Sequence, residues 1–311
     1  MGTSVDIAAA SKAYRAEHPE GEINDIRLLS EGWDSVVYLA NETLVLRFPK
    51  SLGAARGIAT EIRLLPYLRD RVPLPIPQPS VVGAHPFERT SPFVGYACIG
   101  GAELTRERFR TLPSRTKDSI MQDLAAFLQA LHAVDVGAAR DCGVTGRDPR
   151  AEFNDVFARS TALVIPALEG RERATFVAWF EAILGDVTNF TETRTLIHGD
   201  MSPEHIFYDS GTQRICGIID FGDAAIADPD YDLMYSPEDY GQPFVRALLR
   251  YYRHGDTEEL FGKLEAFRLF DAARYTLFGH GRADAEMIRG GLTDLSELLR
   301  QRISRVSGGD S

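Results

Sequence analysis

The sequence predicts an α+β protein with a β-rich N-terminal lobe and a mainly helical C-terminal lobe. Runs rich in β-branched and aromatic residues follow one another through the first 100 residues. Beyond them, apolar residues recur about every three to four positions, the spacing of amphipathic helices. A chain of 311 residues is long enough for two lobes with a substantial core. We therefore expect an N-terminal lobe over residues 1–100 and a C-terminal lobe over residues 101–311.

The N-terminal lobe is expected to contain four strands and two helices. The dipeptide Asn41-Glu42 joins the second and third strands in a hairpin. The second helix stops before Pro73, and the alternating prolines that follow predict a stiff, extended connector. The fourth strand runs into Gly100-Gly101, which marks either a hinge between the lobes or a simple turn. The elements are a helix at 9–19, strands at 23–30, 35–41 and 43–50, a helix at 53–72, and a strand that starts at residue 91 and ends at Gly100-Gly101.

The C-terminal lobe is expected to be helical around a few short strands. In the first helix, five apolar residues share one face: Ile120, Leu124, Phe127, Leu128 and Leu131. Helices are predicted at 116–134, 152–168 and 170–187, short strands at 195–199, 205–209 and 214–222, and a largely helical tail at 241–306.

Charge and composition exclude several classes of protein. The net charge is −11, and the sequence carries no basic stripe of the kind that binds nucleic acid. No run approaches 18 consecutive apolar residues, so we expect no membrane span, and the first residues lack the pattern of a signal peptide. The three cysteines are far apart and favour a reducing compartment over a disulfide framework. We therefore expect a cytoplasmic protein with neither a nucleic-acid nor a membrane partner.

Residues 198–205 read HGDMSPEH and follow the apolar run TLI. The frame matches the H-x-D-x-x-x-x-N loop of protein kinases, in which the Asp orients the acceptor hydroxyl and the Asn binds magnesium. Asp200 takes the place of the Asp, and we expect it to accept the hydroxyl proton. His205 takes the place of the Asn. A neutral imidazole donates a lone pair or holds a water, so His205 either binds Mg²⁺ or only orients Asp200.

A second acidic motif, GIIDFGD, follows twenty residues after Asp200. Asp220 comes at the end of an apolar strand and precedes Phe-Gly, the context of a magnesium-binding carboxylate in phosphoryl-transfer enzymes. The pair of motifs is far more specific than either motif alone. The sequence therefore predicts Asp200 as the catalytic residue and Asp220 as a metal ligand.

The phosphates of a nucleotide are expected to bind to the N-terminal lobe. In SEGWDS, residues Ser30, Gly32 and Ser35 offer hydroxyl and backbone donors, although an ordinary hairpin turn explains the segment equally well. On the next strand, alternation places Arg47 on the face opposite Leu46 and Phe48, so Arg47 is a better phosphate-binding cation than Lys50. Its expected partner is Glu61 on the following helix. The alternative is a solvated ion pair of little energetic value.

An acidic run near both motifs suggests a site for a cation. From residue 215 to residue 245 the chain has no Lys or Arg. Acid-rich stretches are often simple solvated loops, but several carboxylates together attract a multiply charged cation. The candidates for substrate binding are Asp228, Asp230, Glu238 and Asp239.

The segments LIHGDMSPEHIFYD and GIIDFGDAAIADPDYDL resemble the signature of the aminoglycoside phosphotransferases, particularly the 2''-phosphotransferase group, in which a His in place of the loop Asn is usual. LRFPKS, LPIPQP and FVGYACIGGAELT are similar to N-terminal segments of that group. The resemblance extends from about residue 29 to residue 233. It implies a protein-kinase-like fold, magnesium, and ATP or GTP as the phosphate donor.

The resemblance also implies roles for single residues. Asp200 corresponds to the catalytic Asp, and His205 and Asp220 correspond to the metal ligands. Arg47 and Glu61 correspond to the phosphate-binding cation and its helix partner. The backbone of Ala97 and Ile99 falls where the base is held, and Tyr96 falls at the position that gates the base pocket, where a bulky residue is compatible with guanine. The chain departs from the group in reading His-Gly-Asp rather than His-Asn-Asp, and in having Arg rather than Lys at position 47.

The sequence therefore predicts a small-molecule kinase that phosphorylates a hydroxyl of an aminoglycoside-like polycation. The same fold also serves kinases for macrolides, choline or sugars. A second alternative is a nucleotide-binding pseudokinase that has lost its metal ligand at position 205. A hydrolase that uses His198 and Asp200 is the weakest alternative, because the chain has no G-x-S-x-G motif.

Overall fold

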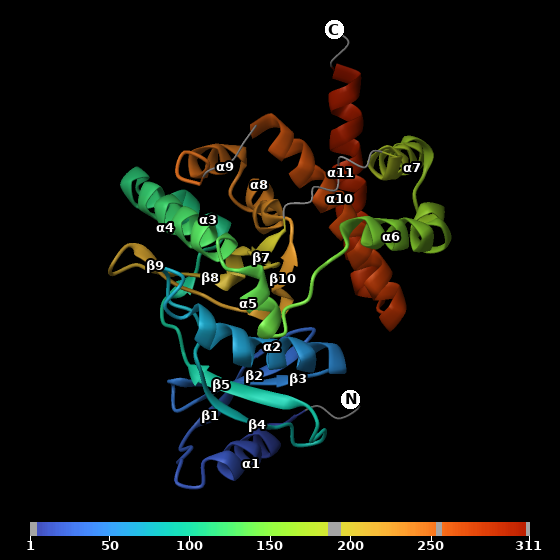
Figure 1. The fold of residues 1–311 in the computed structure, drawn as a ribbon. Helices are drawn as coiled ribbons and strands as arrows, with labels where there is room; N and C mark the ends of the chain where they lie inside the picture. The colour runs from blue at the N-terminus through green and yellow to red at the C-terminus, as the bar shows by residue number, and fades with distance from the viewer. Residues whose placement is uncertain (1–4, 186–193, 253–256, 309–311) are drawn as a thin grey trace. The chain divides into compact units, whose positions relative to one another are not determined.

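The computed structural model describes residues 5–185, 194–252 and 257–308. Contacts between Cα atoms divide the chain into two compact units. The first consists of Met1–Thr145, Thr195–Ile226 and Ser236–His254, and the second of Gly146–Arg194, Ala227–Tyr235 and Gly255–Ser311. The lobe boundary expected near residue 100 falls inside the first unit. The fold has a β-rich N-terminal lobe and a mainly helical C-terminal lobe, as the sequence predicts (Figure 1).

An antiparallel sheet of five strands forms the core of the N-terminal lobe (Figure 1). Positive φ angles at Asn41 and Glu42 confirm the tight hairpin between its second and third strands. The sequence did not predict β4, because its proline-rich approach indicates only a connector. β4 is an edge strand that begins with Pro79, a position where proline is tolerated. The strands are β1 (Ile26–Glu31), β2 (Ser35–Ala40), β3 (Leu44–Pro49), β4 (Pro79–Ala84) and β5 (Pro92–Ala97), in the order β1-β2-β3-β5-β4.

Two helices cover the two faces of this sheet (Figure 1). Helix α1 (Ile7–Glu17) is capped by Asp6 and packs with Phe48 and Phe93 in one apolar cluster. Helix α2 (Leu52–Leu68) begins at the capping hydroxyl of Ser51, and its Ile58 packs with Val45 and Tyr96 on the other face. Helix α2 ends at Leu68, four residues earlier than predicted. Strand alternation thus gives each face of the sheet its own core.

Shorter elements follow the sheet and carry the motifs. Helix α4 (Ser114–His132) buries the five apolar residues that the sequence assigns to one face. Strands β6 (Ala102–Glu103), β8 (Ile206–Asp209) and β9 (Arg214–Ile218) form one small sheet, and β7 (Thr195–Ile197) pairs with β10 (Ala225–Ala227). The helices here are α3 (Arg106–Thr111), α4, α5 (Val136–Asp141), α8 (Ser236–Asp239) and α9 (Gln242–Leu248), with 3₁₀ turns η3 (Pro203–His205) and η4 (Phe221–Asp223).

The second unit is built from helices around an aromatic core. The ring of Phe153 stacks on Phe270, and the indole of Trp179 lies edge-on against Phe180. The helix expected at 170–187 is observed as far as residue 185, and its last two positions lie outside the described residues, as do 253–256 of the expected tail. The elements are α6 (Pro149–Leu163), η1 (Ile165–Ala167), α7 (Gly170–Gly185), η5 (Pro229–Leu233), α10 (Thr257–Arg282) and α11 (Ala285–Gly308).

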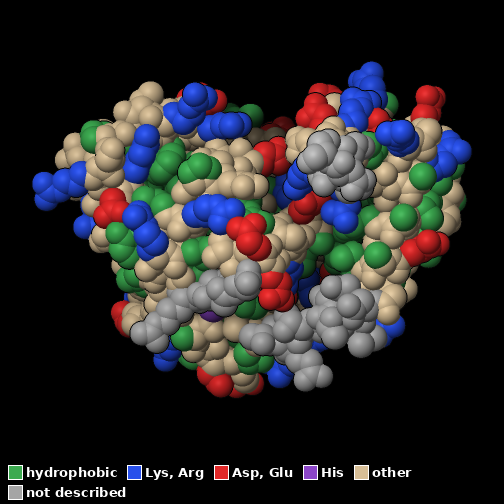
Figure 2. Space-filling model, turned by 90° about the horizontal axis from the view of Figure 1, so that it is seen from above, with side chains coloured by type: hydrophobic (Ala, Val, Ile, Leu, Met, Phe, Trp, Pro, Cys, Tyr) green, Lys and Arg blue, Asp and Glu red, His purple; other side chains and the backbone are tan. Residues whose placement is uncertain are grey.

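Surface charges of both signs are mixed. On the face drawn in Figure 2, Lys and Arg side chains of the described residues lie among Asp and Glu side chains. Among the described residues, no helix combines the length and the hydropathy needed to cross a bilayer.

Candidate active site

The loop that carries Asp200 begins where β7 ends. His198 has no exposed surface, and its two ring nitrogens contact backbone groups. Nδ1 lies 3.2 Å from the amide nitrogen of Asp200, and Nε2 lies 2.9 Å from the carbonyl oxygen of Ile219. Because an amide only donates and a carbonyl only accepts, Nδ1 accepts and Nε2–H donates. His198 thus ties the Asp200 loop to the residue immediately before Asp220, and neither of these ring nitrogens is available for hydrolysis.

Gly199 lets the chain turn sharply between His198 and Asp200. Its φ is +87°, and a Cβ atom built on it would lie 2.4 Å from the carbonyl oxygen of Asp223. Backbone in this region strains residues other than glycine, and the contact with a backbone oxygen leaves no space for a side chain. The departure from the His-Asn-Asp form of the related group therefore follows from local packing in this chain.

The structure brings Asp200, His205 and Asp220 together. Nδ1 of His205 lies 2.9 Å from the carbonyl oxygen of Asp200 and 3.5 Å from its Oδ2. With a hydrogen on Nδ1, which donates to that carbonyl, Nε2 of the neutral ring carries the lone pair. Nε2 lies 3.7 Å from Oδ2 of Asp220. Two possible metal ligands therefore face each other beside the carboxylate that the sequence predicts as the base.

The donor set fits magnesium that is shared with a nucleotide. Among the described residues, no three His, Cys, Asp or Glu side chains form a metal cluster. Mg²⁺ commonly takes only one or two protein ligands and completes its shell with phosphates and water. Adjacent ligands of an octahedral Mg²⁺ lie about 3 Å apart, given bonds of about 2.1 Å. The separation of 3.7 Å between Nε2 of His205 and Oδ2 of Asp220 is close to that value, so these two side chains are the ones that would hold the ion.

The environment shifts the pKa values of the two carboxylates in opposite directions. Burial raises the pKa of Asp200 to about 6, and the neighbouring Asp223 and Asp220 add to this effect, which His205 opposes only when its ring is protonated. Burial also acts to raise the pKa of Asp220, but the Arg47 guanidinium, with a further contribution from His205 when its ring is protonated, outweighs burial and lowers the pKa below its ordinary value. Asp220 therefore stays ionised, as a metal ligand requires. The pKa of Asp200, in contrast, is closer to the value that suits a general base.

Arg47 connects the N-terminal sheet to this site. Nη1 lies 3.0 Å from Oε1 of Glu61, the partner that the sequence predicts, and both side chains are buried. Nη2 donates to Oδ1 of Asp220 at 2.7 Å, and Nε donates to the hydroxyl of Ser35 at 3.1 Å. The ion pair is therefore not a solvated one. The sequence does not indicate the contact with Asp220, because 173 residues separate the two.

Comparison with known proteins identifies the family. A model of the phosphotransferase enzyme family, APH, matches residues 25–269. The chain belongs to this family. It is therefore a phosphotransferase, and the resemblance to the aminoglycoside phosphotransferases is confirmed. The solved GDP and kanamycin complex of APH(2'')-IIIa is 32% identical, with a TM-score of 0.89 over 94% of this chain and 98% of that chain.

Two further comparisons give a solved structure that shares the fold and a curated relative. The structure of macrolide 2'-phosphotransferase type I is 22% identical, with a TM-score of 0.72 over 94% of this chain and 98% of that chain, and it shares the fold. Among curated proteins, the uncharacterized protein YcbJ of Bacillus subtilis (strain 168) is 26% identical over 230 residues, which are 70% of this chain and 71% of that protein. The fold is thus common to phosphotransferases whose names give different acceptors.

In this phosphotransferase the β1–β2 turn differs in part from the expected phosphate cradle. The hydroxyl of Ser35 is buried and accepts from Arg47. Ser30 is exposed on β1, and Gly32 has open space where a side chain would be. The carbonyl of Gly32 accepts from Lys50 at 3.0 Å. Phosphate binding by this turn stays a prediction for Ser30 and Gly32, while the Ser35 hydroxyl is already bonded to Arg47.

The residues predicted to hold the base lie at the end of β5. Tyr96 is buried in the cluster that contains Ile58 of α2. Ala97 ends the strand and is exposed. Ile99 follows two residues later, and its side chain packs against Gly217, where a Cβ would come within 2.6 Å of it. Base binding by Tyr96, Ala97 and Ile99 stays a prediction.

Lys263 pairs with Asp228 and Asp230, two of the four acidic residues predicted to bind substrate. Nζ of Lys263, on α10, lies 2.5 Å from Oδ2 of Asp228 and 2.6 Å from Oδ2 of Asp230. The Asp228 carboxylate also caps η5 by accepting from the amide of Asp230 at 3.0 Å. In the first unit, Glu238 and Asp239 lie on α8, where Glu238 is exposed. Substrate binding by these residues stays a prediction, but the first pair must release Lys263 to bind another cation.

The sequence reasoning missed the structural roles of His198 and Gly199 in the first unit and of Lys263 in the second unit. His198 follows an apolar strand, and that position could have indicated a buried histidine. Gly199 appears only as a departure from a motif, and its necessity depends on the carbonyl of Asp223. Lys263 lies outside the acidic run and gives no local signal.

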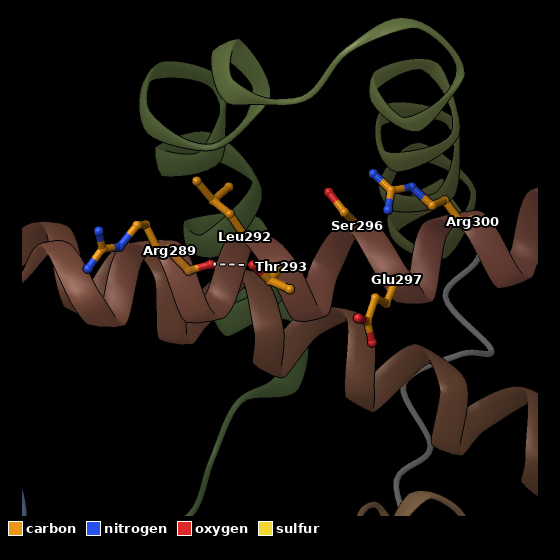
Figure 3. A pocket seen from close by; sticks show the side chains of 6 residues that line it. All are labelled: Arg289, Leu292, Thr293, Ser296, Glu297 and Arg300. Carbon is orange, nitrogen blue, oxygen red and sulfur yellow. Dashed lines mark hydrogen bonds between the residues drawn. The ribbon is translucent and has the colours of Figure 1, made fainter.

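A shallow pocket lies along α11 in the second unit, and Figure 3 shows the side chains that line it. Glu172 of α7 binds Ser296 Oγ at 2.9 Å and Arg300 Nε at 2.7 Å. The lining contains none of the predicted site residues. It consists of Arg289, Leu292, Thr293, Ser296, Glu297 and Arg300.

Proposed function

We propose that this phosphotransferase transfers the γ-phosphate of GTP or ATP to a hydroxyl of an aminoglycoside, most simply the 2''-hydroxyl. The observation that carries the proposal is the 3.7 Å approach of His205 to Asp220 beside the Asp200 carboxylate. The kinship to APH(2'')-IIIa, which was solved with GDP and kanamycin, supports both the nucleotide and the acceptor. The excess of acidic residues favours a cationic acceptor over an anionic one.

In this proposal each residue has one task. Asp200 accepts a hydrogen bond from the acceptor hydroxyl and takes its proton as the bond to phosphorus forms. His205 and Asp220 hold Mg²⁺, which supplies neutralisation of the phosphate charge when it is bound. Arg47 keeps Asp220 in place through Nη2 and is itself fixed by Glu61. Phosphoryl transfer needs little more from a protein than such positioning.

We also propose that residues 1–100 form the nucleotide-binding lobe and that the protein acts in the cytoplasm. The five-stranded sheet and Arg47 belong to that segment, with the Tyr96–Ile99 stretch at its end. A nucleoside triphosphate donor is available in the cytoplasm, and the three cysteines are free thiols, as a reducing compartment favours.

The test is a transfer assay with kanamycin, Mg²⁺ and either GTP or ATP, in which mass spectrometry detects the added phosphoryl group. We expect phosphorylated kanamycin from the native chain. The Asp200→Asn variant should lose activity by about 10²–10⁴-fold, the usual contribution of a general base, while it binds GDP as the native chain does. Asp155→Asn is the matched control, because Asp155 is exposed on α6 and its ion pair is with Arg159, an exposed residue one turn along the same helix.

Three results would redirect the proposal. Transfer to a macrolide, choline or a sugar, but not to kanamycin, would keep the reaction and change the acceptor. Nucleotide binding without transfer to any of these acceptors would contradict a catalytic role for the site. Full activity of the Asp200→Asn variant would remove Asp200 from the reaction.

A further inference from the structure

Helix α2 meets the turn after Asp220 at a glycine. A Cβ atom built on Gly57 would lie 3.0 Å from the carbonyl oxygen of Gly222 and 3.5 Å from its Cα. A contact of 3.0 Å with backbone is tighter than ordinary van der Waals packing, so a side chain here requires a displacement. Gly57 and Glu61 are one turn apart on the same face of α2. The helix therefore touches the Asp220 turn through a bare backbone and, one turn later, binds Arg47.

Gly222 is directly connected to the metal-binding carboxylate. Its amide donates to Oδ1 of Asp220 at 3.3 Å. A Cβ built on Gly222 would lie 3.2 Å from that same oxygen and 3.4 Å from Nη2 of Arg47. Asp220 also has a φ of +63°, an unfavourable conformation for a residue other than glycine that neighbouring structure must maintain. A displaced Gly222 would therefore move Asp220.

Helix α2 cannot easily retreat from this contact. Nε of Arg63 donates to the carbonyl of Cys142 at 2.9 Å, and Thr60 Oγ1 donates to the carbonyl of Gly143 at 3.5 Å. Gly143 has a φ of +90°, and a Cβ there would lie 2.2 Å from Arg63 Nη2. The helix is thus fixed against the turn that follows α5, so a group added at Gly57 acts mainly on Gly222.

We propose that Gly57 is a positioning residue for the magnesium-binding carboxylate. Its missing side chain lets α2 rest on the Gly222 carbonyl and hold Asp220 opposite His205. This contact sets how strongly Mg²⁺ increases the affinity for the nucleotide. Because Mg²⁺ demands near-ideal octahedral geometry, a shift of a few tenths of an ångström at Asp220 is sufficient to weaken the coupling. The inference rests on the proposed function, since it assumes that nucleotide and metal share this site.

The test compares Gly57→Ala with Gly53→Ala. Both glycines are in α2, and alanine improves helix propensity at both positions. At Gly53 the nearest atom to a built Cβ is Oγ of Ser51 at 3.5 Å, an ordinary contact. Equilibrium binding of a fluorescent GDP analogue is measured with and without Mg²⁺, and the melting temperature is recorded for each protein.

In the native chain and in Gly53→Ala, we expect Mg²⁺ to strengthen binding of the analogue by the same factor. In Gly57→Ala that factor should fall by about 10-fold, the lower end of the effect of removing an outer-shell contact of a metal site. Binding without Mg²⁺ should stay within twofold of native binding, and the melting temperature should not fall below that of the native chain. During turnover, the Mg²⁺ concentration that gives half-maximal rate should rise, while kcat at saturating Mg²⁺ recovers.

Two results would overturn the role of Gly57. One is an equal effect of Mg²⁺ in both alanine variants. The other is a loss of metal-free binding together with a lower melting temperature in Gly57→Ala, which would indicate general damage to the fold. If the native chain fails to bind the analogue under any condition, the proposed function itself is wrong and the inference falls with it.

Discussion

At the scale of single residues, the two acidic motifs are distinguished by their neighbours. Asp200 and Asp220 have the same side chain, but only Asp220 contacts the Arg47 guanidinium, at 2.7 Å. That cation counteracts the effect of burial and lowers the pKa of Asp220, while burial raises the pKa of Asp200 to about 6. Opposite shifts in two neighbouring carboxylates are typical of a site in which one acts as base and the other stays charged.

The raised pKa of Asp200 predicts an acid limb in the pH profile. Asp200 accepts a proton only when it is ionised, so kcat/KM should be half-maximal near pH 6, level off about one pH unit above the pKa and fall tenfold per pH unit well below it. Bound Mg²⁺ adds positive charge nearby and moves the limb lower rather than higher. The measurement is kcat/KM between about pH 5 and pH 8 at saturating Mg²⁺. A limb centred well above pH 7, or activity that rises on acidification, would contradict the assignment of Asp200 as the base.

At the scale of elements, η5 and α10 are joined by a partly buried charge cluster. Lys263 of α10 holds both Asp228 and Asp230 of the η5 segment. Burial raises the pKa of Asp228, and Lys263 opposes that effect. The acidic run contains no Lys or Arg of its own. Its carboxylates Asp228 and Asp230 are instead neutralised by Lys263, which lies 33 residues beyond Asp230 in the chain.

Replacing Lys263 by Met should destabilise the protein in a pH-dependent way. Removing one partner of a fully buried ion pair costs about 3–5 kcal/mol, because the remaining charge stays buried, and the loss should be smaller for this partly buried cluster. Without Lys263 the pKa of Asp228 rises further in the folded state. A folded-state pKa above the unfolded value lowers stability when the group is ionised, so the loss should be largest near pH 8 and smaller near pH 5.

Urea unfolding of Lys263→Met at both pH values measures this effect. Lys12→Met is the control, because Lys12 is exposed on α1, and it should leave the free energy of unfolding nearly unchanged. A loss of stability that is equal at both pH values would show that the two carboxylates are not the cause.

The elements also show where sequence reasoning works. The face of α4 and the pairing of Arg47 with Glu61 follow from helical and strand periodicity, which local sequence encodes. Strand β4 and the early end of α2 do not follow from it. β4 exists because β5 provides a partner for its backbone, and its prolines conceal this pairing.

At the scale of the whole molecule, a net charge of −11 acts on the two expected substrates with opposite sign. It attracts a polycationic acceptor and repels a nucleoside triphosphate. Salt screens both effects, since the Debye length falls from about 10 Å at 0.1 M to about 3 Å at 1 M.

Added salt should therefore move the two kinetic constants in opposite directions. We expect kcat/KM for kanamycin to fall several-fold between about 0.1 M and about 1 M NaCl, as screening removes the long-range attraction. Over the same range, kcat/KM for the nucleotide should stay constant or rise. Initial rates with each substrate varied in turn provide the measurement, with KCl in place of NaCl as a control for ion identity. A fall of equal size for both substrates would indicate general inhibition by salt.

The sequence by itself determined the α+β plan, the family and the residue types of the site. It did so because periodicity, motif spacing and turn residues are local properties of a chain. Only the tertiary structure decided that Arg47 binds Asp220, that Gly57 rests on Gly222, and that Lys263 occupies the carboxylates of Asp228 and Asp230. These contacts join residues that are far apart in the chain. Whether a charged side chain forms an ion pair or is placed to bind a metal depends on distances of a few ångströms, which no local sequence pattern specifies.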